Sequence, residues 1–315
     1  MATPPRREPI PFGKYFLQER IAIGSTSEMW RGILQMDDGQ ERLVAIKRML
    51  PNLAGDMEAL CMFIDEAKIQ VQLSHANIVQ AYELGMVGGQ YFMALEYIDG
   101  QPLRAFFERF AKLGESTPLP VVCHCIAQMC DGLDFAHHKQ DAKGRDLNVV
   151  HRGLSLDEVL VSYGGDVKVI DFGIVKAAGR ATMTSLGIIK GKFGYTSPEQ
   201  LRGLPVDRRS DVYAAGVCLY ELLTGRRLFD GSNHVTGLEQ MDASPVPPPS
   251  RYNPQVPPEL DAIVHKALAD KPSERYSSAG ELGNAVRLFL SHSGINFNRE
   301  ELARYMSSTF ARVIQ

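Results

Sequence analysis

The hydrophobic pattern of the chain changes once, at the tetrapeptide DGQP (residues 99–102), and this change constrains the fold more than any other feature. Before it, residues 12–49 and 79–97 contain short β-like runs, such as RLVAIKRML and YFMALEYI. After it, apolar residues follow helical spacing over longer stretches, at 104–113, 118–138, 211–223, 256–268 and 278–290. The pattern predicts an α+β, bilobal fold with a β-rich N-lobe over 12–98 and a mainly helical C-lobe over 99–290.

Each lobe is also expected to contain a minority of the other element. In the first lobe, MEALCMFIDEAKIQVQL (residues 57–73) has helical spacing, which predicts one amphipathic helix with its apolar face formed by Leu60, Phe63, Ala67 and Val71. In the second lobe, short strands are expected around 148–150, 158–162 and 166–170.

The two ends of the chain lie outside this pattern. Residues 1–11 form an N-terminal extension, and Arg6 and Arg7 precede no apolar core, so a signal peptide is not expected. Residues 291–315 form a C-terminal helical extension, because REELARYMSSTFARVI has the spacing of one more amphipathic helix, which we expect to pack on the C-lobe.

Charge and hydropathy exclude two classes of partner. With 34 Lys and Arg against 37 Asp and Glu among 315 residues, the balance gives no reason to expect nucleic acid or an acidic membrane surface. The longest strongly apolar run, VYAAGVCLYELL (residues 212–223), is too short to cross a bilayer and contains Glu221. These features predict a soluble, cytoplasmic protein.

Two local patterns have competing interpretations. Cys123, Cys125 and Cys130 lie beside His124, but C-x-C-x4-C is no common zinc spacing and the first two cysteines point to different sides of a helix, so core packing is favoured over a metal site. The proline-rich segment 245–258 (PVPPPSRYNPQVPP) could be a polyproline ligand for a partner domain. A stiff surface connection between two helices is the favoured interpretation.

Three charged residues occupy positions that suit a nucleotide triphosphate. Lys47 ends the alternating run VAIK, and Glu66 lies on the expected helix, so a Lys–Glu pair would hold the ammonium toward phosphate. Asp171 directly follows an apolar strand and precedes Gly173, a suitable place for a carboxylate that holds a metal ion. Each residue alone would be an ordinary surface charge, but three of them in this order favour a phosphate site.

The order of the motifs is more specific than any one of them, because over about residues 12–290 the chain resembles the protein kinase family, and in particular the eukaryotic-like Ser/Thr kinases of bacteria. The motifs that carry the resemblance are, in chain order, VAIK (44–47), Glu66, LSHANIV (73–79), ALEYIDG (94–100), HRG (151–153), DFG (171–173), SPE (197–199), RRSDVYAAGVCLYELLTG (208–225) and Arg275 in KPSERY.

The resemblance implies ATP between the two lobes, with Mg²⁺ or Mn²⁺ held by Asp171 and Glu158. The ATP-binding residues that it implies are Ala22, Gly24, Ala45, Lys47, Glu66, Glu96, Ile98, Leu160 and Asp171. It also implies three structural contacts: a Glu199–Arg275 ion pair, a stack of His151 on Phe172, and anchoring of the catalytic-loop backbone by Asp211.

The departures from the family pattern gather where phosphate and hydroxyl would react. Gly153 stands where the family has the catalytic Asp, and Glu158 stands where it has the metal-binding Asn. Asp157 would have to be brought round by refolding of the loop to act as a substitute. In the glycine-rich loop, Ala22 and Ser27 replace the outer glycines, which loosens the approach of backbone to phosphate without forbidding it.

These departures predict a pseudokinase: a scaffold or allosteric regulator that binds an active protein kinase or another signalling protein and retains weak ATP binding. The alternative is a weak Ser/Thr kinase that uses Lys47, Glu66 and Asp171. Transfer of a different ATP-derived group is a third, less favoured interpretation. Phosphorylation of the chain by a partner kinase is one interpretation of the segment between DFG and SPE, with Thr182, Thr184 and Ser185 as candidate sites and Arg152, just before Gly153, as the residue that would grip the phosphate. The equally favoured alternative is an ordinary Ser/Thr-rich loop, with Arg152 only bracing the backbone.

Overall fold

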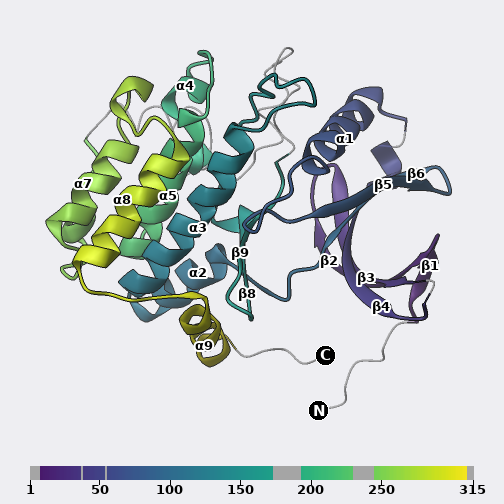
Figure 1. The fold of residues 1–315 in the computed structure, drawn as a ribbon, viewed down its shortest axis with the longest axis horizontal. Helices are drawn as coiled ribbons and strands as arrows, with labels where there is room; N and C mark the ends of the chain where they lie inside the picture. Colours follow the sequence, from purple (N-terminus) through teal and green to yellow (C-terminus); the bar gives the residue numbers. More distant parts are fainter. Residues whose placement is uncertain (1–7, 37, 54, 173–192, 230–244, 311–315) are drawn as a thin grey trace. The chain divides into compact units, whose positions relative to one another are not determined.

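The computed structural model describes residues 8–36, 38–53, 55–172, 193–229 and 245–310 (Figure 1). The chain forms two compact units, and each has its own architecture. The first runs to Ser74 and takes in Val79–Ile98, and the second consists of His75–Ile78 and the chain from Asp99 onward. The first unit is rich in strands and the second in helices, so the α+β prediction is confirmed.

The first unit is built on one antiparallel sheet with the strand order β1-β2-β3-β4-β6-β5. Its elements are β1 (Ile10–Phe12), β2 (Tyr15–Ile23), β3 (Ser27–Gln35), β4 (Glu41–Met49), the 3-10 turn η1 (Pro51–Leu53), α1 (Met57–Gln70), β5 (Ala81–Val87) and β6 (Gln90–Glu96). One face of the sheet buries aliphatic and aromatic side chains together, and the rings of Phe12 and Tyr15 meet the edge of Phe92 at 5.2 and 5.6 Å.

Helix α1 is the predicted amphipathic helix of this unit. The side chain of Asp56 caps its first turn by accepting hydrogen bonds from the N–H groups of Glu58 and Ala59 at 2.9 and 3.1 Å. Phe63 and Ala67 are buried, as the apolar pattern predicts. The prediction for Val71 is wrong: it lies just past the last helical residue and is 43% exposed, because the apolar face ends with the helix.

The second unit consists mainly of helices. They are α2 (Leu103–Leu113), α3 (Leu119–His137), α4 (Pro198–Leu201), α5 (Arg209–Thr224), α7 (Pro258–Ala267), α8 (Ala279–His292) and α9 (Arg299–Thr309). Short 3-10 turns are η2 (Leu156–Glu158), η5 (Phe193–Tyr195), η6 (Pro249–Arg251) and η7 (Pro272–Glu274). Helix α5 is buried along its length from Ser210 to Thr224, and α3 packs against both α5 and α8 (Figure 1).

A small sheet of the order β7-β8-β9 completes this unit, formed by β7 (Gly100–Pro102), β8 (Val159–Ser162) and β9 (Val167–Val169). Strands β8 and β9 confirm two of the three predicted strands. No strand forms at 148–150, where Asn148 takes a left-handed backbone conformation (φ 48°) that interrupts an extended run.

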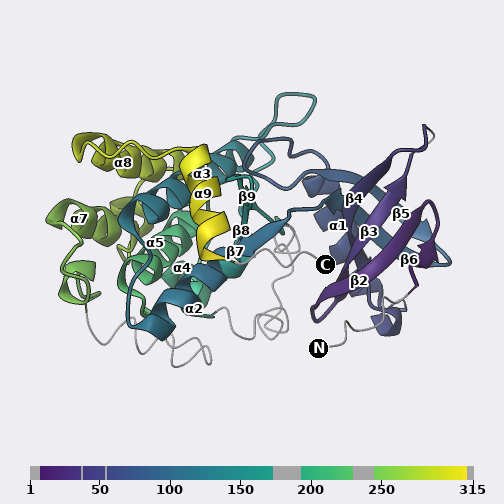
Figure 2. The same cartoon turned by 90° about the horizontal axis from the view of Figure 1, so that it is seen from below.

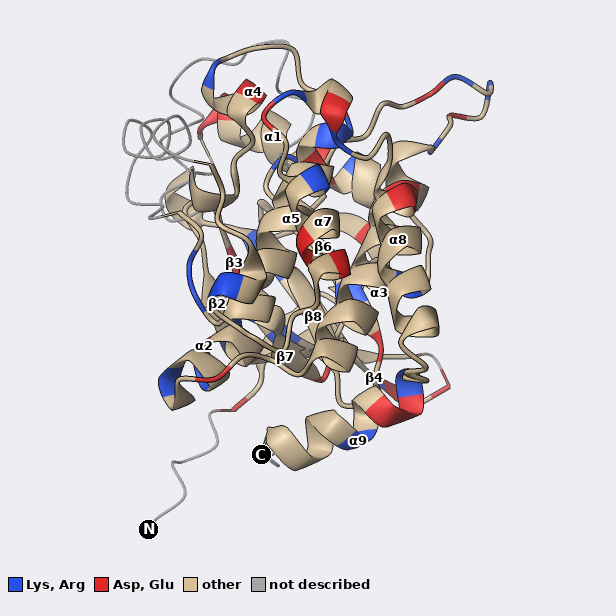
Figure 3. Ribbon diagram, turned by 90° about the vertical axis from the view of Figure 1, so that its left-hand side faces the viewer, with Lys and Arg blue, Asp and Glu red and all other residues tan. Residues whose placement is uncertain are grey.

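The C-terminal helix α9 packs on the second unit, as predicted, and lies beside β7 and β8 (Figure 2). Arg299 in its first turn binds Asp166 in the β8–β9 turn through two nitrogens, at 2.7 and 3.1 Å. Gly165 lets this turn approach so closely that an added Cβ would lie 2.1 Å from the Arg299 carbonyl oxygen. Leu302 and Met306 are buried, while charged residues of both signs mark the beginning of the helix (Figure 3).

The structure also bears on the two ambiguous patterns. Cys123, Cys125 and Cys130 are buried on α3, and burial raises the pKa of the Cys123 thiol to about 12, so these residues pack in the core. Within the described ranges, no group of three or more His, Cys, Asp and Glu side chains could hold a metal ion. In the proline-rich segment, the Asn253 amide donates to the Leu223 carbonyl at 2.8 Å, which fits a connection fixed to the second unit.

A membrane-spanning helix is not found among the described residues, since none of the helices there combines the length and apolar character that crossing a bilayer requires.

Candidate functional site

The first unit contributes the predicted lysine–glutamate pair. Lys47 lies near the end of β4 and Glu66 lies on α1, and the Lys47 ammonium donates a hydrogen bond to the Glu66 carboxylate. The side chains of both residues are largely shielded from solvent. The strand and the helix therefore hold this ion pair in place, and the structure brings together two residues that the sequence analysis assigned to ATP.

The turn between β2 and β3 corresponds to the glycine-rich loop of the sequence analysis. Gly24 N–H donates to the Ser27 carbonyl at 2.8 Å, and the Thr26 carbonyl accepts from Leu50 N–H at 3.0 Å. An added Cβ on Gly24 would lie 3.3 Å from the Ser27 carbonyl oxygen, so this tight turn favours glycine. Ala22 is exposed and pairs with Met29 across the hairpin.

The residues expected to contact adenine divide between the two units. Ala45 is buried on β4, opposite Leu95 of β6. Glu96 ends β6, and its N–H donates to the Gln80 carbonyl at 2.8 Å, so an adenine contact of Glu96 would fall to its carbonyl oxygen. Ile98 is the last residue of the first unit, and Leu160 is half-buried on β8 in the second.

In the second unit, two residues of the candidate site hold an uncommon backbone conformation. Asp171 and Arg152 both have positive φ, at 58° and 60°. Such strain in non-glycine residues costs on the order of 1–3 kcal/mol each and persists only where the surroundings determine it. The neighbouring Phe172 is buried, and its ring lies 4.9 Å from that of His151, which confirms the expected contact, although the rings are tilted by 58° rather than parallel.

Asp211 on α5 anchors the segment that contains HRG, as predicted. Its carboxylate accepts hydrogen bonds from the N–H groups of His151 and Arg152 at 2.7 and 2.8 Å, and its Oδ2 lies 2.7 Å from His137 Nε2. Burial alone would raise the pKa of Asp211, but these hydrogen bonds and the facing histidines hold it below its usual value. The carboxylate therefore acts as a buried anion that fixes backbone.

Gly153 is the residue after Arg152 in the anchored segment. It is buried, and its N–H donates to the His151 carbonyl at 2.8 Å. The position carries no side chain that could accept a proton. Asp157 does not take its place: its side chain is 50% exposed, and Arg104 of α2 binds its Oδ2 through two nitrogens, each at 3.4 Å. The structure therefore directs the nearby carboxylate toward α2.

The two carboxylates expected to hold metal lie at the same end of the β8–β9 hairpin. Glu158 immediately precedes β8 and is only 6% exposed, and its carbonyl accepts from Ile170 N–H at 3.0 Å. Asp171 is the next residue after Ile170, so the hairpin register brings the two positions near each other. The ion pair of Glu199 with Arg275 is also formed, buried and bidentate at 2.8 and 2.7 Å.

Sequence reasoning missed a buried polar network around Arg104. Arg104 donates to the Tyr195 hydroxyl at 2.6 Å, and that hydroxyl donates to the Glu221 carboxylate at 2.5 Å. The only signal in the sequence was an arginine among the apolar residues that begin the 104–113 stretch.

Gly173 and the candidate phosphosites lie outside the described residues; those sites are Thr182, Thr184 and Ser185.

Curated relatives cover most of this chain. Tyrosine-protein kinase MasK of Myxococcus xanthus (strain DK1622) is 42% identical over 281 residues, which are 89% of this chain and 44% of MasK. Serine/threonine-protein kinase PknL of Mycobacterium tuberculosis (strain ATCC 25618 / H37Rv) is 37% identical over 86% of this chain and 64% of PknL. PrkC of Bacillus subtilis (strain 168), also a serine/threonine-protein kinase, is 32% identical over 91% and 42%. The chain spans about half the length of these relatives.

The fold and the family rest on two further comparisons. The crystal structure of the Mycobacterium tuberculosis PknI kinase domain matches with a TM-score of 0.65 and 24% identity, covering 91% of this chain and 99% of that one. The predicted kinase fold is thereby confirmed. The family model for the protein kinase domain matches residues 15–286. This chain belongs to the protein kinase family.

Proposed function

We propose that this chain is a pseudokinase, which acts by binding as a scaffold or allosteric regulator of an active protein kinase or another signalling protein. The observation that carries the proposal is Gly153. At this position the family has an aspartate that orients the hydroxyl group of the substrate. A positioned acid–base group contributes roughly 10²–10⁴-fold to the reaction rate. The side chain of glycine is a single hydrogen atom, which cannot make this contribution.

The surroundings of Gly153 support the proposal, because neither carboxylate of the described loop that follows it stands in position as a replacement. Asp157 is held by Arg104 at the surface, and Glu158 is buried beside the β8–β9 hairpin. Moving either carboxylate to the place of the missing aspartate would break the 3-10 turn η2, in which Ser155 Oγ accepts from Asp157 N–H at 3.3 Å. The loop would have to refold before it could catalyse.

Nucleotide binding is part of the proposal. Lys47, paired with Glu66, would face the phosphates, and Asp171 with Glu158 would hold Mg²⁺ or Mn²⁺. The residues fit such a group, because an ammonium is held by its ion pair and two carboxylates lie at one end of a hairpin. When bound, the metal ion would offset the repulsion between the two carboxylates and the polyphosphate. We therefore infer weak binding that depends on a divalent cation.

The second candidate function is weak phosphotransfer from ATP to protein hydroxyls. The retained Lys47–Glu66 pair favours it, as do the names of the relatives, which are kinases. MasK is named a tyrosine kinase and PknL a serine/threonine kinase, so the test has to offer both kinds of hydroxyl.

The test is an assay of the unmodified chain with radiolabelled ATP, in Mg²⁺ and in Mn²⁺, on a generic basic protein substrate and on a tyrosine-containing peptide. A pseudokinase gives incorporation equal to that of a Lys47→Met variant prepared in parallel. Incorporation that is robust in the unmodified chain and lost in Lys47→Met would establish the second candidate function instead.

A further inference from the structure

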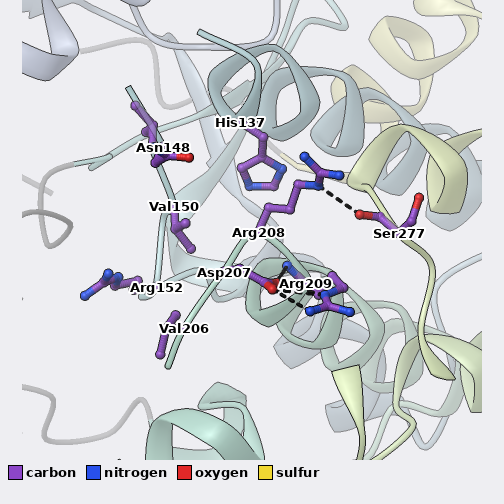
Figure 4. Close-up of a pocket in the computed structure, with 10 residues that line it drawn as sticks. His137, Asn148, Val150, Arg152, Val206, Asp207, Arg208, Arg209 and Ser277 are labelled. Carbon is purple, nitrogen blue, oxygen red and sulfur yellow. Dashed lines mark hydrogen bonds and ion pairs between the residues drawn. The ribbon is translucent and has the colours of Figure 1, made fainter. Parts of the chain in front are cut away.

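A pocket of about 470 Å³ lies in the second unit, between the end of α3, the segment 148–152 and the residues that lead into α5 (Figure 4). Its floor is formed by residues that are buried, namely His137, Val149 and Val150. Its rim is formed by exposed residues, namely Asn148, Asp207, Arg208 and Ser277. The volume falls within the roughly 300–1,000 Å³ typical of ligand sites, so the pocket has room for more than a single small anion.

The pocket carries an excess of positive charge. Among the described residues that line it, three are arginines and one, Asp207, is acidic. Arg209 already occupies that carboxylate, with Nε 3.0 and 3.1 Å from its two oxygens and Nη2 2.6 Å from one. Among the described residues, no carboxylate forms an ion pair with Arg152 or Arg208. Glu281 also lies at this rim, because its Oε2 accepts from Ser277 N–H at 2.9 Å, and together with Asp207 it partly offsets the charge of Arg208. Neither carboxylate forms an ion pair with Arg208, so both guanidinium groups keep N–H donors for a ligand.

The first of these cations is partly withdrawn from water. The Nε atom of Arg152 is buried and finds no hydrogen-bond acceptor among the residues that the structure describes. Leaving a buried donor unsatisfied costs about 1–3 kcal/mol, and more for a charged group. Burial lowers the pKa of Arg152, although the charge of Asp211 opposes the shift. The oxygens of Asp211 are occupied by backbone N–H groups and by His137, so Asp211 offsets the charge of Arg152 without binding its guanidinium.

The second cation is held in a fixed orientation. Arg208 Nε donates to the Ser277 carbonyl at 2.9 Å, which directs the side chain along one side of the pocket. In Figure 4, Arg208 and Arg152 extend toward opposite sides, with Val150 between them. The pocket therefore presents a cation, an aliphatic surface and a second cation.

This arrangement matches an extended peptide with carboxylates on either side of apolar residues. A guanidinium recognises a carboxylate through two parallel hydrogen bonds. Without phosphate, the segment of this chain at 173–192 has the wrong charge for the pocket, because it contains four Lys and Arg residues and no Asp or Glu.

We propose that this pocket docks an acidic segment of a partner protein, whose carboxylates bind Arg152 and Arg208. The inference rests on the proposed function, in which the chain acts by binding, and it names the chemistry of the partner surface.

The test measures fluorescence anisotropy with a labelled synthetic peptide, GEEVVEEG, added to the whole chain without nucleotide after intact-mass measurement has shown that no phosphate is attached. Saturable binding of this peptide is expected, with no binding of the matched peptide GQQVVQQG. The Arg208→Gln variant should bind at least about tenfold more weakly, because one of the two cations is removed. Arg208 is exposed, so its variant should retain the melting temperature of the parent chain.

Arg251→Gln is the matched control, since it removes the same charge from an exposed arginine that does not line the pocket. Its affinity should equal that of the parent. Equal weakening in both variants, equal binding of the two peptides, or no binding of either would overturn the proposal. So would binding of a phosphoserine analogue, GSVVSG phosphorylated on both serines, by a chain that ignores GEEVVEEG, because the pocket would then be a phosphate site. None of these results depends on phosphotransfer, so a failure of the peptide to bind can be distinguished from a failure of the proposed function, which the ATP assay tests.

Discussion

Helix α5 and the segment 151–158 lie against each other but have changed to different degrees from the family pattern. The helix keeps Asp211, which fixes the backbone of the segment, and its Ser210 hydroxyl donates to Glu199 at 2.5 Å. The segment has Gly153 where the family pattern has an aspartate. The buried polar contacts of α5 hold the fold together, whereas a catalytic aspartate acts only on a substrate, so it can be replaced while the fold is kept.

The contrast between α5 and the segment 151–158 is tested most directly by returning the family's residues to the segment. The double substitution Gly153→Asp with Glu158→Asn should raise phosphotransfer by roughly 10²–10⁴-fold, because it returns the acid–base group and a neutral metal ligand to a loop that Asp211 already positions. Radiolabelled ATP with the substrates described above measures the rate. The same change with Lys47→Met added should be inactive. A double variant that gains nothing would contradict the proposal that this segment alone limits phosphotransfer.

The opposite test removes an anchor next to α5. Arg275→Ala should lower the free energy of unfolding by about 3–5 kcal/mol, because it leaves the buried Glu199 carboxylate without its bidentate partner. Lys271→Ala, which breaks the exposed pair with Glu274 at 3.2 Å in the same stretch, should cost no more than about 1 kcal/mol. Urea denaturation compares the two variants, and similar losses would contradict the distinction between anchors and surface pairs.

Measurements of ATP binding test whether Glu158 of this segment, together with Asp171, makes the binding depend on a divalent cation. We expect ATP to raise the melting temperature by a few degrees in Mg²⁺ or Mn²⁺, and not in excess chelator, because Glu158 and Asp171 would otherwise repel the phosphates. Glu158→Gln should reduce the dependence on metal by removing one charge. An equal shift with and without metal would contradict the role given to these carboxylates.

The smallest expected effect is a pH dependence that arises from Asp211. Its folded pKa lies below the value of about 3.9 for an unfolded aspartate, so it stabilises the fold at neutral pH. That contribution should be lost as the pH falls below about 4 and through the folded pKa. Urea midpoints measured from pH 7 to pH 3 should decline less steeply in Asp211→Asn than in the parent chain, and identical slopes would show that other groups dominate.

Much of the fold was predictable, because hydrophobic periodicity determines helices and strands when one face is buried. The stretch at 211–223 became α5, and the stretch at 278–290 became α8. Periodicity failed where an element ends, so Val71 is exposed rather than buried, and where the backbone turns, so the expected strand at 148–150 is interrupted at Asn148. Neither event changes the apolar spacing of the sequence.

The sequence by itself determined what the chain lacks and what family it resembles: Gly153 has no carboxylate in any conformation, and Lys47, Glu66 and Asp171 occur in the family's order. Only the tertiary structure decided where the remaining charges point. Arg104 and Asp157 are 53 residues apart, and their contact holds toward α2 one of the two carboxylates that follow Gly153 in the same loop. The pocket at Arg152 and Arg208 likewise joins segments that no local pattern relates. The sequence specifies which chemical group each position carries, but hydrogen bonds and ion pairs depend on distances that only the packing of the folded chain sets.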